Sequence, residues 1–270
     1  MKLGISSWTF PWAIGVPGYL PDHPMTALGL LDRAAELGVR VVQIADNLPL
    51  AALPPSGLER LAQHAASLAI GIEVGTRGIA PENLRTHLRL ARHFRSPIVR
   101  VVVDTKEHRP SPDDVVAILR PLLPEFEQAG VCLAIENHDR FKARMLARIL
   151  GQLGSRSVGV CLDTANSFGA LEGPDVVVKT LGSLTLNLHV KDFAIRRSSS
   201  NMGFVVEGCA AGQGMLDVPW LLKQMVALRR DPNAIIELWT PSEPDLHETI
   251  NKEAAWAQTS VQYLRQLIPD

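Results

Sequence analysis

The stretch Val131-Cys-Leu-Ala-Ile-Glu-Asn-His138 is a hydrophobic run that stops abruptly at an acid, Glu136. Three later hydrophobic runs also end on a side chain that can bind a metal. They are Val158-Gly-Val-Cys-Leu-Asp163, Leu186-Asn-Leu-His189 and Ala234-Ile-Ile-Glu237. Short apolar strands that deliver Glu, Asp, His and Glu at the same end predict a divalent-metal site at the mouth of a parallel barrel.

Eight β-like segments, each followed by a helical pattern, can be counted along the 270 residues. The segments are continuous Val/Ile/Leu runs, as in a parallel sheet that is covered on its faces. Eight βα units in this length predict a single α/β domain, residues 1–270, folded as a (β/α)8 TIM barrel. A doubly wound sheet seldom has eight evenly spaced units, and no GxGxxG follows the first segment. The expected strands are Lys2–Ser7, Val41–Ala45, Ile70–Gly75, Ile98–Val103, Val131–Ile135, Val158–Leu162, Leu184–Leu188 and Ala234–Glu237.

Two connecting segments stand out. The helix expected to end at Gly130 is capped by Ser111 and contains Pro121 and Pro124, which predict a bend. The longest expected loop runs over residues 191–215 and contains Arg196-Arg-Ser-Ser-Ser. We interpret it as a flexible loop that could serve as a lid.

Composition narrows the class of protein. A hydrophobic content of 46%, a charged content of 20% and a net charge of −1 suit a globular enzyme and give no general attraction to nucleic acid or anionic membranes. No apolar run approaches the roughly 20 residues of a membrane span. The three cysteines, Cys132, Cys161 and Cys209, lack CxxC spacing, and the two within strands predict buried free thiols. We therefore expect a cytoplasmic protein that binds neither nucleic acid nor membrane.

In a TIM barrel the active site lies at the carboxyl ends of the strands, so Glu136, Asp163, His189 and Glu237 should converge there. A single acid at a strand end is ordinarily a helix cap or the partner of a lysine, but four such residues on four consecutive strands are harder to explain that way. Three carboxylates and an imidazole suit one divalent ion, with Mn²⁺ preferred and Mg²⁺, Co²⁺ or Zn²⁺ as alternatives. The absence of a thiolate argues against a closed structural zinc site.

Five motifs, in this order, resemble the xylose isomerase-like TIM-barrel superfamily of sugar isomerases and epimerases, which includes hydroxypyruvate isomerases, ketose 3-epimerases and inosose dehydratases. The resemblance implies that the four side chains above bind the metal and that Glu136 and Glu237 are also the acid/base pair. The motifs are Ile135-Glu-Asn, Cys161-Leu-Asp-Thr, His189-Val-Lys-Asp, Ala211-Gly-Gln-Gly-Met-Leu-Asp217 and Ile236-Glu.

The chain departs from the family pattern at two positions. Many members have Asp-Thr-Gly-His where this chain has Asp163-Thr-Ala-Asn166, so Asn166 replaces a histidine that contacts substrate. Gln213 stands where an acid is frequent. The tracts at residues 12–18 and 41–49 further resemble the 3-oxo-isoapionate decarboxylases of the same superfamily.

The residues support several related reactions on a small keto sugar or sugar acid. A divalent ion that polarises a carbonyl stabilises an enediolate, and two carboxylates on opposite faces can move a proton, which favours isomerisation or epimerisation. The same electron sink also serves loss of CO₂ from a 3-oxo acid, such as 3-oxo-isoapionate, or loss of water. Arg77, Lys191 and Arg140 on the catalytic side favour an acidic substrate. The expected substrate-binding residues are Trp8, Arg77, His138, Asn166 and Lys191.

Two other classes of function compete. A relative of endonuclease IV would need extra histidine ligands on the second to fourth strands and a basic face, whereas these strands end in Ala45-Asp46, Gly75 and Val103-Asp104. A non-catalytic sugar-binding barrel would lack bound metal. Barrels of this superfamily often form homo-oligomers, but no feature of the sequence specifies one.

Overall fold

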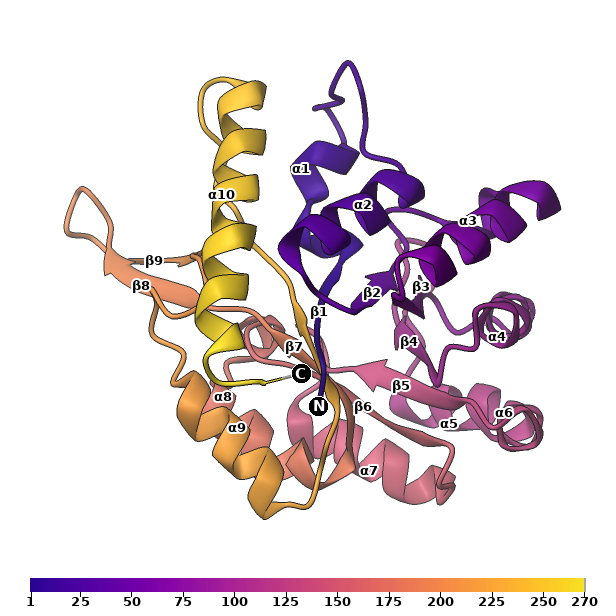
Figure 1. Ribbon diagram of the computed structural model, residues 1–270. Helices are drawn as coiled ribbons and strands as arrows, with labels where there is room; N and C mark the ends of the chain where they lie inside the picture. The colour runs from indigo at the N-terminus through magenta and orange to yellow at the C-terminus, as the bar shows by residue number, and fades with distance from the viewer. Residues whose placement is uncertain (270) are drawn as a thin grey trace.

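The computed structural model describes residues 1–269, and within them eight parallel strands close into a barrel (Figure 1). The order around the barrel is β1-β10-β7-β6-β5-β4-β3-β2, so strands adjacent along the chain are mostly adjacent in space. The predicted TIM barrel is confirmed. The barrel strands are β1 (Leu3–Ser6), β2 (Val41–Ile44), β3 (Gly71–Arg77), β4 (Ile98–Val102), β5 (Cys132–Glu136), β6 (Val158–Asp163), β7 (Thr185–Val190) and β10 (Asn233–Ile236).

Helices surround the strands and cover their outer faces (Figure 1). The α-helices are α1 (Pro11–Ile14), α2 (Ala27–Leu37), α3 (Pro55–Ser67), α4 (Pro81–Phe94), α5 (Pro112–Leu119), α6 (Leu123–Ala129), α7 (Ala143–Leu153), α8 (Pro174–Leu181), α9 (Val218–Ala227) and α10 (Leu246–Arg265). Short 3₁₀ turns are η1 (Ser7–Thr9), η2 (Leu50–Ala52), η3 (Arg120–Leu122), η4 (Asn166–Ala170) and η5 (Gly182–Leu184). None of the helices in the described chain has the length and apolar character of a membrane span.

The strands are buried on both faces because helices cover the outside and side chains fill the inside. Every residue of β1, β2, β4 and β6 is buried. Alternate residues of each strand face the barrel interior. Outward-facing residues, such as Leu133 and Ile135 of β5, pack in the large core beneath the helices, whereas Ala134 belongs to a small cluster with Ile98 and Cys161. The interior positions are therefore few, and polar residues there lie close to one another.

The bend predicted between Ser111 and Gly130 is observed. The segment divides into α5, η3 and α6, with Pro121 in the 3₁₀ turn and Pro124 in the first turn of α6. Pro121 lacks the N–H that a continuous helix would need, so the break follows from its chemistry. Gly130 ends α6 in the left-handed conformation, at φ 65°. The chain then turns into β5, whose last residue is Glu136.

The segment after β7 is not the irregular loop that we expected. It forms an antiparallel hairpin, β8 (Phe193–Arg197) and β9 (Phe204–Gly208), which projects from the barrel at the left of Figure 1. The prediction of a flexible loop missed this hairpin because its strands are short and its alternation is weak. Asp192 anchors its base: the buried carboxylate accepts hydrogen bonds from the backbone N–H groups of Gly212, Gly214 and Leu216.

Candidate metal centre and active site

Four strand ends bring the predicted site residues together. Glu136 and Asp163 are the last residues of β5 and β6, His189 lies near the end of β7, and Glu237 follows β10 directly. Register places Asp163 beside His189 across β6 and β7. All four side chains are buried, and we call them the upper cluster.

The imidazole of His189 is the centre of the upper cluster. Its Nδ1 lies 3.4 Å from Glu237 Oε1, 3.5 Å from Glu136 Oε2 and 3.7 Å from Asp163 Oδ2. One ligand atom from each of Asp163, His189 and Glu237 falls within a common 4.8 Å span. Bonds of about 2.0–2.2 Å to a single ion bridge such separations.

Two atoms of the upper cluster are buried without a hydrogen bond, namely His189 Nδ1 and Asp163 Oδ2. The other carboxylate oxygen of Asp163, Oδ1, accepts from the backbone N–H groups of Ala165 and Asn166 at 2.8 and 2.7 Å. The turn after β6 thus fixes Asp163 with Oδ2 directed at His189. An unpaired buried polar atom is costly, so a pair of them facing one another among carboxylates fits a divalent ion.

Two buried cations offset the acids. Lys191 Nζ forms ion pairs with Asp163 Oδ2 and Glu237 Oε2, each at 3.0 Å. Arg100 of β4 donates from Nε to Glu136 Oε2. Burial disfavours the ammonium of Lys191, but Asp163 and Glu237 outweigh this and raise its pKa.

The acids respond in the opposite sense. Burial alone would raise the pKa of Glu237, but His189, Lys191 and Arg100 outweigh it and lower that pKa. The pKa of Asp163 is lowered in the same way against its burial, chiefly by Lys191. Both carboxylates are therefore ionised and ready to act as ligands at neutral pH.

A cavity of about 120 Å³ opens above the upper cluster. Asp46, after β2, organises one side of it: its Oδ1 accepts from Trp8 Nε1 at 3.4 Å and from Arg100 Nη1 at 3.2 Å, and its Oδ2 accepts from Arg77 Nε at 3.2 Å. Trp239 also lines the cavity, with Lys191 Nζ 5.1 Å from its ring centroid. The cavity is lined by Trp8, Arg77, Arg100, Glu136, His138, Asn166, Lys191, Glu237, Leu238 and Trp239.

Comparison with known proteins agrees with the barrel fold. The family model described as xylose isomerase-like TIM barrel matches residues 31–267. The chain belongs to that family. A curated relative, 3-oxo-isoapionate decarboxylase from Pectobacterium atrosepticum, is 36% identical over 266 residues, which are 98% of this chain and 95% of the relative.

Solved structures share the fold of this xylose isomerase-like barrel. D-psicose 3-epimerase from Clostridium cellulolyticum H10, solved with D-tagatose, has a TM-score of 0.73 at 16% identity and covers 98% of this chain and 99% of its own. A xylose isomerase-like TIM barrel protein from Mycobacterium smegmatis, in complex with magnesium, has a TM-score of 0.69 at 16% identity and covers 97% of both chains.

All five expected substrate-binding residues line the cavity above the upper cluster, but their environments differ; they are Trp8, Arg77, His138, Asn166 and Lys191. Asn166 is buried and bridges two groups: its Nδ2 donates to Glu136 Oε1 at 2.7 Å, and its Oδ1 accepts from Lys191 Nζ at 3.3 Å. Lys191 itself is 4% exposed, so it belongs to the floor rather than the rim. Arg140 pairs with Asp104 instead of the cavity.

Several residues of the site were not anticipated from sequence. Arg100, Gln43, Asn187 and Glu73 are polar residues inside otherwise apolar strands, and that interruption was the signal available. Counting back two residues from His189 reaches Asn187, on the same interior face. The same count from Asp163 reaches Cys161, a buried free thiol whose pKa burial raises to about 11.

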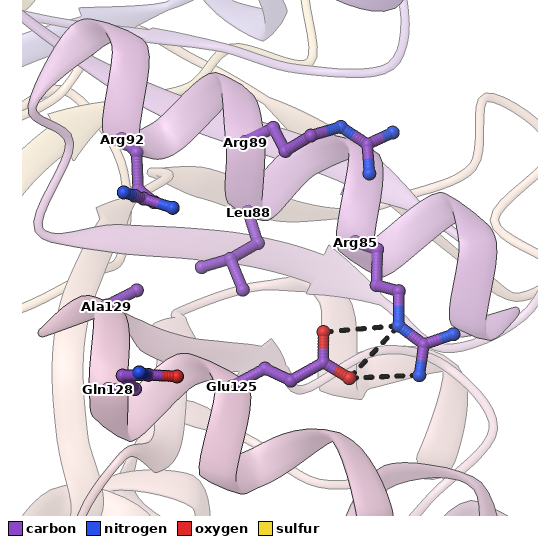
Figure 2. A pocket seen from close by; sticks show the side chains of 7 residues that line it. All are labelled: Arg85, Leu88, Arg89, Arg92, Glu125, Gln128 and Ala129. Atoms are coloured by element: carbon purple, nitrogen blue, oxygen red, sulfur yellow. Dashed lines mark hydrogen bonds and ion pairs between the residues drawn. The ribbon is translucent and has the colours of Figure 1, made fainter.

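A larger cavity lies elsewhere. A groove of about 490 Å³ runs between α4 and α6, and Figure 2 shows its arginines spread along one helix. Arg85 is engaged by Glu125, with Nε–Oε1 and Nη2–Oε1 distances of 3.0 and 2.9 Å. None of the residues that line this groove is among those of the described chain with a buried side-chain atom that lacks a hydrogen bond.

Proposed function

We propose that this chain is a divalent-metal-dependent decarboxylase of a 3-oxo sugar acid, working as one catalytic domain. The Pectobacterium relative supports the reaction, because its likeness extends over nearly the whole of both chains. The observation that carries the proposal is the pair of arginines, Arg77 and Arg100, held by Asp46 beside the upper cluster.

In this proposal Glu136, Asp163, His189 and Glu237 hold one divalent ion. Manganese suits the three carboxylates and one imidazole, and Mg²⁺, Co²⁺ and Zn²⁺ are the alternatives. When bound, the ion supplies Lewis-acid stabilisation of the negative charge that develops on the carbonyl oxygen of the substrate.

Arg77 and Arg100 would bind the substrate carboxylate. The Asp46 carboxylate accepts hydrogen bonds from Arg77 Nε and Arg100 Nη1, and the backbone carbonyl of Asp104 accepts one from Arg77 Nη1. Among the hydrogen bonds of residues 1–269, none uses Nη2 of either arginine. Two fixed guanidinium groups with a free donor each suit a carboxylate.

Charge balance favours the same substrate class. Around the cavity, Glu136, Asp163, Glu237 and Asp46 are opposed by Arg77, Arg100 and Lys191, which leaves one net negative charge among these side chains. A divalent ion would reverse this to one net positive charge. An anionic substrate then restores neutrality, whereas a neutral ketose does not.

Decarboxylation breaks the bond between the carboxylate carbon and the carbon next to the carbonyl. The electron pair moves toward the carbonyl oxygen, CO₂ leaves, and the carbon takes up a proton. We assign delivery of this proton to the ammonium group of Lys191, which lies 3.0 Å from Glu237 Oε2 and lines the cavity with it; Lys191 then regains a proton from solvent. Trp8 and Trp239 would shield the reacting carbon from solvent.

Isomerisation or epimerisation of a keto sugar is the second candidate. Glu136 and Glu237 both line the cavity and both approach His189, so they can serve as the two carboxylates that remove and return a proton. In that reaction Arg77 would contact a hydroxyl group or a phosphate rather than a carboxylate.

The test combines metal analysis with product analysis. Elemental mass spectrometry of the purified protein should find about one divalent ion per chain. Incubation of 3-oxo-isoapionate and a ketose panel in D₂O, followed by NMR with CO₂ detection, should give stoichiometric CO₂ and one deuterium at the carbon that lost it. Deuterium exchange without CO₂ would establish the isomerase alternative. A protein that binds no metal under any loading would refute both reactions as proposed.

A further inference from the structure

A second polar cluster lies inside the barrel, one layer closer to the amino ends of the strands than the upper cluster. We call it the lower cluster; it consists of Gln43, Glu73, Asn187 and Asn233. Glu73 is its hub: Oε2 accepts from Gln43 Nε2 at 3.1 Å and from Asn187 Nδ2 at 2.9 Å, while Oε1 accepts from Asn233 Nδ2 at 2.8 Å.

The amide of Gln43 is held in one orientation by this hub. Its Nε2 donates both protons, one to Glu73 Oε2 and one to Asn187 Oδ1 at 3.0 Å. A flipped amide would place Gln43 Oε1 against the oxygens of Glu73 and Asn187, where there is no donor for it. The lower cluster therefore determines that Gln43 presents its carbonyl oxygen, and not its NH₂ group, to the layer above.

In the layer above, Gln43 contacts His189. The histidine Nε2 lies 2.8 Å from Gln43 Oε1, and because that oxygen can only accept, Nε2 must carry a proton. The neutral ring then has its lone pair on Nδ1, the atom that faces Glu136, Asp163 and Glu237 at 3.4–3.7 Å. A partner on the far nitrogen that fixes the ring and its tautomer is a general device of metal sites.

We propose that Gln43 is a positioning residue: locked by Glu73 and Asn187, its carbonyl oxygen holds His189 as the Nε2–H tautomer with Nδ1 directed at the metal position. This inference rests on the metal site of the proposed function. The orientation of the His189 ring is thus set from the layer below it, by a side chain of β2 that contacts neither the metal position nor the substrate cavity.

The decisive variant is Gln43→Met, which keeps the length of the side chain and removes the acceptor. Gln63→Met, on the exposed face of α3, is the matched control. Zn²⁺ affinity would be measured by competition with a chromogenic chelator. We expect Gln43→Met to bind about 10–100-fold more weakly than wild type, the usual range for loss of an outer partner, and Gln63→Met to be unchanged.

A spectroscopic readout separates positioning from general destabilisation. In ¹⁵N-histidine-labelled, zinc-loaded protein, the His189 ring should show a protonated Nε2 and a coordinated Nδ1, with its signals assigned by their absence in His189→Asn. Gln43→Met should lose this single pattern. Unchanged affinity together with an unchanged His189 pattern would overturn the inference while leaving the metal site intact.

Glu73→Gln provides a second route, since it leaves Gln43 in place but lets its amide turn over. We expect a Zn²⁺ affinity between those of wild type and Gln43→Met, with two sets of His189 signals. If circular dichroism shows that Gln43→Met does not fold, Glu73→Gln becomes the test. One unperturbed set of His189 signals in Glu73→Gln would then overturn the inference. Absence of Zn²⁺ binding by wild type would instead be a failure of the proposed function.

Discussion

The upper cluster holds three acids and an imidazole, whereas the lower cluster holds one acid and three amides. Both lie inside one barrel, and all of their members except the half-buried Asn233 are buried, yet they differ in how they satisfy their polar atoms. In the lower cluster, Glu73 alone takes three hydrogen bonds from amide groups. In the upper cluster, the buried atoms His189 Nδ1 and Asp163 Oδ2 have none. No atom of the lower cluster is among the unpaired buried atoms of the described chain.

This difference separates a polar cluster that supports structure from one built to receive something. Burial of polar groups costs free energy unless they are paired, so a protein that retains unpaired atoms among three carboxylates has a use for them. The lower cluster also shows that an acidic residue deep in a barrel does not by itself identify an active site. What distinguishes the candidate site is that two buried ligand atoms, His189 Nδ1 and Asp163 Oδ2, lack a hydrogen bond beside two further carboxylates.

The largest effect should follow removal of a ligand from the upper cluster. We expect His189→Asn and Glu237→Gln to reduce metal from about one ion per chain to near zero, a loss beyond the 10–100-fold typical of outer partners. Elemental analysis after dialysis measures it. Glu107→Gln and His108→Asn are exposed matched controls that should retain the ion. Full metal content in His189→Asn or in Glu237→Gln would contradict the assignment of metal binding to the upper cluster.

A smaller effect is expected at the cavity rim. Arg77→Met should reduce kcat/KM for an anionic 3-oxo acid about 10–100-fold, since hydrogen bonds to charged groups contribute roughly 1.5–3 kcal/mol. Metal content should not change, because Arg77 pairs with Asp46 and not with the upper cluster. Steady-state kinetics beside Arg89→Met, an exposed arginine of α4, test this. An equal loss of kcat/KM in Arg77→Met and Arg89→Met would show that Arg77 does not bind the substrate.

The lower cluster should respond in stability rather than in metal stoichiometry. Asn233→Ala deprives Glu73 Oε1 of its partner and also removes the oxygen that accepts from the backbone N–H of Lys2. We expect a cost of about 1 kcal/mol in the free energy of unfolding, the low end for unpaired buried groups because Asn233 is half-buried. Urea titration measures the cost, with Asn251→Ala as control. Loss of the metal in Asn233→Ala would contradict a purely supporting role for this end of the cluster.

A buried acid outside both clusters extends the comparison to pH. Glu253 of α10 accepts from the backbone N–H groups of Trp12 and Ala13, yet burial outweighs these bonds and raises its pKa from 4.5 to about 8. The folded protein therefore binds more protons than the unfolded chain between these values. The stabilising contribution of Glu253 is complete below pH 4.5 and is lost as the pH rises toward 8.

Glu253→Gln should flatten this dependence. Relative to the variant, wild type should lose at most about 1.4 kcal/mol of stability per pH unit between pH 5 and 8. Urea titrations at several pH values measure the difference, and Glu59→Gln, an exposed acid, should follow wild type. Parallel pH curves for wild type and Glu253→Gln would show that Glu253 is ionised throughout.

The sequence by itself determined the barrel and the four side chains of the upper cluster. Strand identity is local, because continuous apolar runs between helical patterns suffice to recognise a covered parallel sheet. The topology then dictates that residues ending β5, β6, β7 and β10 meet at one mouth. Their convergence required no knowledge of side-chain contacts, and the break at Pro121 was likewise readable from a missing N–H.

Only the tertiary structure decided the partners of these residues. The Gln43 contact with His189 joins strands that are 146 positions apart in the sequence, and Arg100 reaches both Asp46 and Glu136. The hairpin of β8 and β9 likewise depends on its pairing and on Asp192, not on local pattern. Pairing across the barrel depends on rotamers and register, which hydrophobic periodicity leaves open.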